Sequence, residues 1–271
     1  MATVARLAVL VAASLVFLAP LLWLLDIALK TFGELSAVPI KILPESPQWV
    51  NFHDAFTVFP WFVFAWHSLF LSTLFAALTV CSSAVVGFGF ARLRGRGKNV
   101  LFMIMLSTMM LPAIATLIPT YIIFSRISLV YTYWPWVFWG LGSSPFFSFL
   151  FRQFFASIPI ELEEAALLDG CGYIRIFWQV FLPLSKAVMS VVFLLSFQSV
   201  WSDYITPNLL LDIDQTTLAV RVATSYVNPM GTQLPNVMAA GALLYALPVA
   251  VVFVVLQRFL VQGIVTTGLK G

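Results

Sequence analysis

Residues 55–91 of the chain have the sequence AFTVFPWFVFAWHSLFLSTLFAALTVCSSAVVGFGFA. This stretch contains no Asp, Glu, Lys or Arg, and His67 is its only histidine. A helix needs about 20 mostly apolar residues to cross the hydrocarbon core of a bilayer. Residues 55–91 are therefore long enough for one membrane-spanning helix and an external segment that leads into it.

The composition of the whole chain agrees with this interpretation. Of the 271 residues, 61% are hydrophobic and 9% are charged, whereas soluble globular domains contain roughly 45–50% apolar and about 25% charged residues. A chain with so few charged residues cannot cover itself with a water-soluble surface. The composition excludes a soluble domain and predicts an all-α integral membrane protein.

Apolar stretches of similar length predict six transmembrane helices. The first stretch has an alternative interpretation as a cleaved secretory signal, because Arg6 and several small residues lie near its start. It continues to Leu25, however, which favours a retained span. The predicted spans are residues 7–25, 55–91, 99–125 and 127–151, a helix between Pro183 and Pro207, and a last helix that begins near Val237.

The distribution of Lys and Arg predicts how these helices are oriented, because cytoplasmic loops carry an excess of both residues. With both termini in the cytoplasm, ten basic residues lie inside and four lie outside, and the net charge of +3 reflects topology. No nucleic-acid partner is expected. The inner residues are Arg6, Arg92, Arg94, Arg96, Lys98, Arg152, Arg175, Lys186, Arg258 and Lys270, and the outer residues are Lys30, Lys41, Arg126 and Arg221.

Short connections and the lack of a flexible linker predict a single domain over residues 1–271. The cytoplasmic loop between the fourth and fifth spans is a polar excursion between two membrane helices, so we expect an outside partner to bind there. The segments outside the spans are an irregular external segment 31–60, the cytoplasmic loop 157–183, an external loop 205–236 and a cytoplasmic tail 258–271.

The cytoplasmic loop is expected to contain a helix of about three turns within SIPIELEEAALLDG, residues 157–170. Pro159 suits the first helical position, and Gly170 is expected to end the helix in the left-handed conformation. Ala165 and Ala166 have almost no side chain, so another surface can approach the helix closely. The acidic residues of the opening turns, where the helix dipole favours anions, are Glu161, Glu163 and Glu164.

The same loop resembles the permease subunits of ATP-binding-cassette (ABC) importers. Their motif is Glu-Ala-Ala, three residues, Gly, nine residues, Ile, any residue and Leu-Pro. The chain has Glu164-Ala165-Ala166, Gly170, Val180 and Leu182-Pro183 at this spacing, and only Val180 departs from the motif. The alternative is an amphipathic connector helix that contains Glu-Ala-Ala by chance. The resemblance implies the type I importer permease fold.

In that family the loop helix is a coupling helix, which rests in a cleft of a partner ATPase subunit and transmits its closure to the membrane helices. The residues that correspond to this contact are Glu164, Ala165, Ala166, Asp169 and Gly170. The chain itself has no phosphate-binding loop, because the basic turn around Gly97-Lys98 is followed by Asn99 and lacks the required upstream glycine. We expect no catalytic activity and no cofactor in this chain, and ATP and Mg bound by the partner.

A finer resemblance, over nearly the whole chain, is to the smaller, C-terminal-type permease of the maltose and glycerol-phosphate importers. Residues 89–98 resemble that group's Ala-Phe-Ala-Arg turn, and residues 263–271 resemble its Gly-rich tail, whose Lys270 and Gly271 are expected to reach toward the ATPase dimer interface. The resemblance implies carbohydrate, polyol or sugar-phosphate uptake across the cytoplasmic membrane of a prokaryote. The implied partners are a second permease, an ABC ATPase dimer and an extracellular or lipid-anchored solute-binding protein.

Polar residues within the spans are candidates for the solute pathway, because ionisable groups are costly inside a membrane. Asp203 either binds sugar hydroxyls, caps a helix end or pairs with Arg221. His67 is either a ligand or, as we favour, a hydrogen-bonded packing residue, and Trp201 either stacks on a sugar ring or lies at the membrane interface. The full set of candidates is His67, Gln198, Trp201, Ser202, Asp203 and Asn208.

Other functions fit the sequence less well. An importer of amino acids, phosphate or phosphodiesters remains an alternative. A stand-alone secondary transporter or channel usually shows inverted repeats and several buried charges, and the sequence shows neither. An enzyme is disfavoured because the chain contains no His-Glu-x-x-His, Gly-x-Ser-x-Gly or paired-Cys motif.

Overall fold

The structure is a computed structural model that describes residues 2–39 and 41–268. Within these ranges the secondary structure is helical, apart from one isolated bridge between Val227 and Gln233. The helices are α1 (Ala2–Ala28), α2 (Phe32–Leu35), α3 (Val50–Thr57), α4 (Trp61–Arg92), α5 (Lys98–Ser107), η1 (Thr108–Met110), α6 (Ala113–Arg126), α7 (Trp134–Leu141), α8 (Pro145–Ser157), α9 (Ile160–Leu168), α10 (Tyr173–Ile176), η2 (Phe177–Phe181), α11 (Leu182–Leu184), α12 (Lys186–Trp201), α13 (Ile205–Leu210), α14 (Leu218–Thr224) and α15 (Pro235–Gly268).

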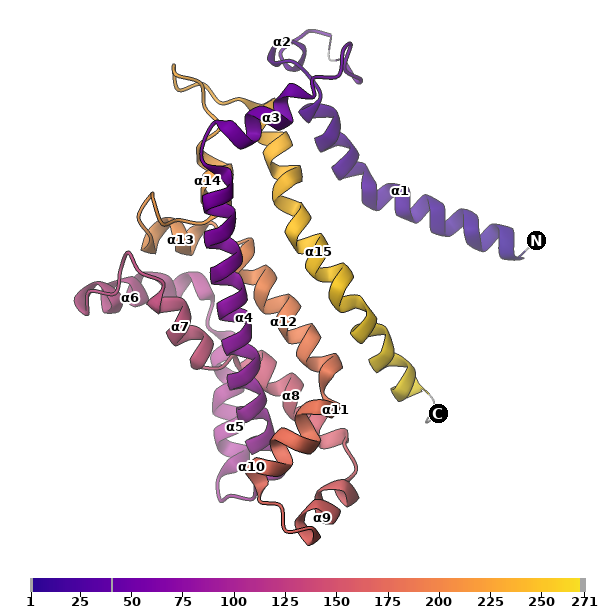
Figure 1. Cartoon of the computed structure of the whole chain (residues 1–271), viewed down its shortest axis with the longest axis vertical. Coiled ribbons are helices and arrows are strands. Elements are labelled where there is room, and N and C mark those ends of the chain that lie inside the picture. Colours follow the sequence, from indigo (N-terminus) through magenta and orange to yellow (C-terminus); the bar gives the residue numbers. More distant parts are fainter. Residues whose placement is uncertain (1, 40, 269–271) are drawn as a thin grey trace. The chain divides into compact units, whose positions relative to one another are not determined.

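The chain forms two compact units that each combine distant parts of the sequence (Figure 1). One unit contains the described residues up to Trp66 together with Thr217–Pro248. The other contains His67–Thr216 and the described residues from Val249 onwards. The long helices α4 and α15 contribute to both units. The second unit contains the predicted cytoplasmic loop and every candidate site residue.

Three helices are long and apolar enough to cross a membrane, namely residues 9–28, 61–92 and 235–259. They confirm helices of sufficient length and hydropathy to span a membrane in the stretches predicted at 7–25, at 55–91 and near Val237. Two further candidates are bent pairs, with a bend of 98° between residues 98–110 and 113–126 and of 80° between 173–184 and 186–201. Proline explains the first bend, because Leu111 before Pro112 adopts an extended conformation.

The span predicted at residues 127–151 is not one helix. The structure places α7 and the start of α8 there, and Ser143 between them has a φ of 61°. Pro145 opens α8 at its first turn, which suits a proline because no amide donor is needed there. The described residues therefore contain three to five candidate spans, and the count of six with both termini inside stays a prediction.

The segments outside the spans contain more helix than we expected from their prolines. The external segment 31–60 contains α2 and α3, and the external loop 205–236 contains α13 and α14. Thr31 and Glu34 form a capping box at α2. The backbone amides of Thr31 and Glu45 donate to the Glu34 carboxylate at 2.7 and 2.8 Å, and these bonds lower its pKa to about 2.

Close contact between α4 and α8 builds the core under the cytoplasmic loop. A Cβ atom at Gly87 would lie 2.5 Å from Cβ of Phe151 and 3.1 Å from the carbonyl oxygen of Ser148. Only a glycine permits this approach. Gly89, one half-turn further along α4, has no such neighbour within 4 Å.

We predict that Gly87→Ala lowers the free energy of unfolding by about 1–3 kcal/mol, because the added methyl group overpacks the α4–α8 contact. Thermal unfolding of the purified protein in detergent measures the effect. Gly89→Ala is the matched control, since it makes the same change in the same helix with room for the methyl group. Equal transition temperatures for the two variants would show that the contact is not tight.

Candidate functional site

Helix α9 forms the centre of the predicted coupling loop. Pro159 lies at its N-cap, one position before the first helical residue and not at that residue as predicted. Glu161 and Glu163 occupy the first turn, near the positive end of the helix dipole. Gly170 follows the C-cap residue Asp169 with a φ of 80°, which confirms that it ends the helix in the left-handed conformation.

One face of α9 is exposed although it carries small and apolar side chains. Glu164, Ala165, Asp169 and Gly170 are exposed, and Leu168 at the helix end is 89% exposed. Ala166 is half-buried and packs on the apolar core below. Exposed apolar side chains mark surfaces that bind other proteins, and the small side chains beside Leu168 let such a partner approach closely. Sequence analysis singled out the alanines but missed Leu168.

Arg92, the last residue of α4, connects this helix to the rest of its unit. Its Nη2 donates to the carbonyl oxygens of Phe155, at 2.6 Å, and Ile158, which lie at the C-terminal end of α8. Its Nη1 lies 3.5 Å from Oε2 of Glu163 on α9. The guanidinium also lies 4.9 Å above the ring of Phe181. One side chain therefore joins the ends of α4, α8 and α9 to the segment that follows.

The Arg92–Glu163 pair is shielded from water. The two side chains are only 8% and 9% exposed. Glu163 Oε2 has no hydrogen-bond donor among the described residues, so its contact with Arg92 is an ion pair. Removing either member of a buried pair leaves an uncompensated charge, which costs about 3–5 kcal/mol. Neither residue was on the list of candidate site residues, because burial of the pair depends on the tertiary fold.

A cluster of aromatic rings supports this joint from below. Phe88 of α4 packs against Phe155, Phe177 and Phe181, with ring centroids 6.1, 5.2 and 5.0 Å away. These rings belong to a buried core that also contains Phe151 and onto which Ala166 of α9 packs. Because protein interiors are close-packed, a displacement of α9 is transmitted to α4, α8 and the α10–α12 segment.

One of the predicted pathway residues, Asp203, lies in the wall of a cavity. Asp203 lines a cavity of about 310 Å³ between α4, α6, α7, α12 and α13. Its Oδ1 accepts a hydrogen bond of 3.1 Å from the Thr206 amide, so the carboxylate also holds the start of α13. Arg221, the other suggested partner of Asp203, lies above the rings of Phe59 and Phe64.

The same cavity contains groups that sequence analysis missed. The indole rings of Trp136 and Trp139 form part of its wall. They pack edge to face, with ring centroids 5.7 Å apart. Aromatic faces and hydroxyl groups around one carboxylate can hold a polar molecule with apolar faces. The sequence signal that could have indicated these groups is a pair of threonines four residues apart, which lie on the same face of α6. The hydroxyl groups in the wall belong to Thr116, Thr120, Ser199 and Thr206.

The remaining candidates lie outside this cavity. Trp201 is buried and stacks on Phe197, with ring centroids 5.6 Å apart. Gln198 and Ser202 are exposed, and the Ser202 hydroxyl donates to the Gln198 carbonyl oxygen at 2.7 Å. Asn208 is also exposed.

His67 is half-buried. Its Nδ1 lies 3.4 Å from the Thr216 carbonyl oxygen, and its ring lies edge-to-face to Tyr133. The predicted tail is helical from residue 258 to 268 as the end of α15. Lys270 and Gly271 lie outside the described residues.

Residues 83–266 match the family of binding-protein-dependent transport system inner membrane components. The chain belongs to this family. It is 33% identical to the maltose/maltodextrin transport system permease protein MalG of Photorhabdus laumondii, over 93% of this chain and 90% of the relative. It is also 33% identical to MalG of Escherichia coli K12, over 94% of this chain and 96% of the relative.

A solved structure with the same fold is that of a bacterial ABC transporter involved in the import of the acidic polysaccharide alginate. The TM-score is 0.80 at 20% identity, over 94% of this chain and 95% of that one. Together with the family match, it confirms the resemblance to ABC importer permeases and their type I fold. Permease subunits of this family are integral membrane proteins and are typically not catalytic.

We predict that Arg92→Met and Glu163→Gln each lower the free energy of unfolding of the permease by about 3 kcal/mol, because each leaves the partner group buried and unpaired. Thermal unfolding of the purified permease measures this loss. The loss of unfolding free energy in the double variant is expected to be smaller than the sum of the two single losses, because the two residues interact directly.

Glu161→Gln is the matched control, because Glu161 is an exposed acid in the same turn of α9. Its effect is expected to stay within about 0.5 kcal/mol. If the losses of the Arg92 and Glu163 variants were fully additive, the two side chains would not interact energetically, and this prediction would be wrong.

Proposed function

We propose that the chain is the membrane-spanning subunit of an ATP-driven importer for a carbohydrate or a related polyol or sugar phosphate. The family match over residues 83–266 carries this proposal, together with the exposed face of α9. A helix that is exposed on one side and buried through Glu163 on the other suits a lever between a partner and the membrane helices. The lever would alternate the bundle between inward and outward openings.

The proposed partners follow from the same arrangement. An ABC ATPase dimer would hold α9 at Glu164, Ala165, Ala166, Asp169 and Gly170, and it would bind the ATP and Mg that drive transport. A second permease would complete the pathway. An extracellular or lipid-anchored binding protein would deliver the solute, and the complex would lie in the cytoplasmic membrane of a prokaryote. The exposed Leu168 adds an apolar contact for the ATPase.

Two observations support a carbohydrate as the solute. Relatives that are 33% identical over more than nine-tenths of this chain are named as permeases for maltose and maltodextrin. The cavity beside Asp203 is lined by two indoles, four hydroxyl groups and a carboxylate. Three of the hydroxyl groups donate to backbone carbonyl oxygens and can accept hydrogen bonds from a solute. Such groups bind sugars through stacking on the ring and hydrogen bonds to its hydroxyls. His67, Gln198, Trp201, Ser202 and Asn208 remain proposed pathway residues outside this cavity.

The coupling role of α9 predicts that Gly170→Trp lowers solute uptake by roughly tenfold or more while ATP hydrolysis falls much less. No atom lies within 4 Å of a Cβ at this position, so the indole has room beside the helix and blocks the close approach of a partner, and the φ of 80° adds a backbone strain that the Asn control shares in part. The measurement is uptake and ATP hydrolysis by the complete importer in proteoliposomes.

Gly170→Asn is the matched control, because Asn tolerates the left-handed conformation and adds little bulk. It is expected to keep most of the uptake. Full-speed uptake by the Trp variant, or by vesicles that contain this chain without an ATPase, would contradict the proposed function.

The role of Asp203 is tested by comparing Asp203→Asn with Asp203→Ala. Asn keeps an oxygen for the Thr206 amide, whereas Ala removes both the charge and this contact. If the carboxylate binds the solute, both variants raise the KM for uptake by roughly tenfold or more, because a hydrogen bond to a charged group is lost. Normal kinetics for Asp203→Asn would leave the residue only its role at the helix end.

Asp212→Asn is the control for the loss of an outer carboxylate. Asp212 also accepts a backbone amide, that of Ile213, at 2.7 Å, but it does not line the cavity. The KM for uptake by the Asp212→Asn variant is expected to remain at the wild-type value. Assembly with the ATPase should be intact in all three variants, because none lies near α9.

A further inference from the structure

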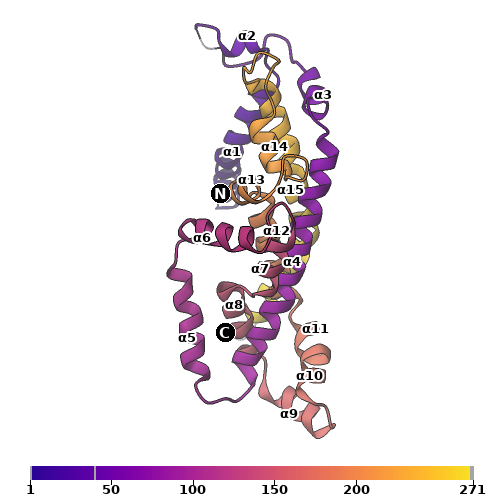
Figure 2. The same ribbon diagram turned by 90° about the vertical axis from the view of Figure 1, so that its left-hand side faces the viewer.

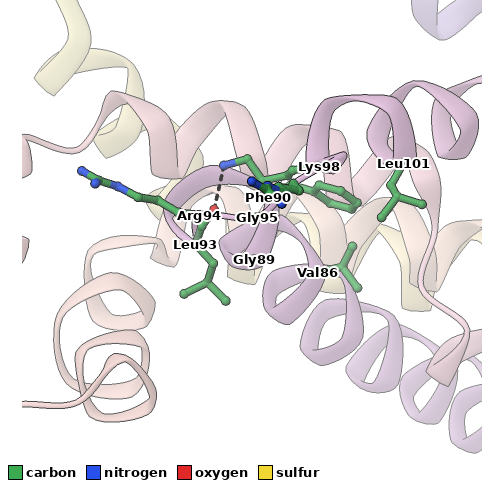
Figure 3. A pocket seen from close by; sticks show the side chains of 9 residues that line it. Val86, Gly89, Phe90, Leu93, Arg94, Gly95, Lys98 and Leu101 are labelled. Carbon is green, nitrogen blue, oxygen red and sulfur yellow. Dashed lines mark hydrogen bonds between the residues drawn. The ribbon is translucent and has the colours of Figure 1, made fainter.

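The turn between α4 and α5 carries a second pocket, which no role in coupling or solute passage explains. It has a volume of about 360 Å³. Val86, Phe90, Leu93 and Leu101 form its apolar wall (Figure 3). The rest of its lining is glycine backbone and three cations, Arg94, Arg96 and Lys98.

The three cations of this pocket have no acidic partner in the part of the chain that the structure describes. Among the residues that the structure describes, no carboxylate lies within 4.0 Å of their nitrogen atoms. Arg92, by contrast, is neutralised by Glu163. Lys98 Nζ donates to the Leu93 carbonyl oxygen at 2.8 Å, as the dashed line in Figure 3 shows, and Arg94 extends away from the turn. The pocket is therefore open to an anion.

The pocket lies at the end of a candidate membrane-spanning helix. The candidate span 61–92 ends immediately before it. In both views of the second unit, the turn lies at the same end as α9 (Figures 1 and 2), and the Arg92–Glu163 pair connects the two directly. Helix α5 continues from the turn with exposed apolar side chains, which are Val100, Leu101, Met103 and Ile104.

We propose that this pocket binds an anionic phospholipid of the cytoplasmic leaflet. Basic clusters beside transmembrane helices on the cytoplasmic side bind acidic headgroups. Arg96 and Lys98 would hold the phosphate, and the charge of Arg94, whose side chain extends away from the turn, would add to the attraction for an acidic headgroup. The wall formed by Leu93 and Leu101 would hold the first part of an acyl chain. A soluble phosphate would need only the cations, and an acidic protein would have no use for an apolar wall that follows a membrane helix.

The test uses the complete importer in nanodiscs of phosphatidylcholine that contain a phosphatidylglycerol with a photoactivatable acyl chain. Crosslinks are expected at residues 86–101. They should be displaced by unlabelled phosphatidylglycerol and not by phosphatidylcholine or inorganic phosphate. Arg94→Gln combined with Arg96→Gln is expected to lower them by roughly tenfold or more, because each cation at a membrane surface strengthens binding to acidic lipid several-fold. Leu101→Gln should lower them as well.

Arg126→Gln combined with Lys41→Gln is the matched control, because it removes two cations that do not line the pocket. It should leave the crosslinks unchanged. The proposal is overturned if phosphate competes as well as the lipid, or if Leu101→Gln has no effect. It is also overturned if ATPase binding requires the two arginines and abolishes the crosslinks, since the cluster would then be a protein-binding surface.

Discussion

The buried guanidinium of Arg92 is the contact on which the cytoplasmic end of the protein depends. It binds backbone oxygens at the end of α8, the Glu163 carboxylate on α9 and the face of Phe181. A lysine could not make these contacts together, because it lacks the planar fork of donors. The short helix α9 has few buried residues of its own, so this joint and the aromatic core hold it in place.

Neighbouring basic residues serve different purposes because their surroundings differ. Arg92 points into the protein and is paired, whereas Arg94 and Arg96 are exposed and have no acidic partner among the described residues. A count of positive charges treats all three arginines as equivalent when it predicts the orientation of the chain in the membrane. Only their position relative to α9 and the apolar wall separates a structural joint from a proposed lipid site.

Prolines and glycines divide the apolar stretches more finely than their length suggests. Composition alone predicts one continuous helix in each stretch of about 20 apolar residues. The extended backbone at Leu111-Pro112 and the break around Ser143 instead divide two of these stretches into shorter helices. Such breaks are tolerated when neighbouring parts of the protein satisfy the freed backbone groups. The breaks bring α6, α7 and α13 around the cavity that contains Asp203.

The sequence by itself determined the membrane class, a long helix within residues 55–91, another that begins near Val237, the end of α9 at Gly170 and the family. These features depend on local composition, on a single backbone conformation and on a motif of fixed spacing. Only the tertiary structure decided that Glu163 turns inward to Arg92, that Trp201 is buried and that Asp203 shares a cavity with Trp136 and Trp139. Those outcomes depend on which distant segments pack together, and neither periodicity nor composition specifies that packing.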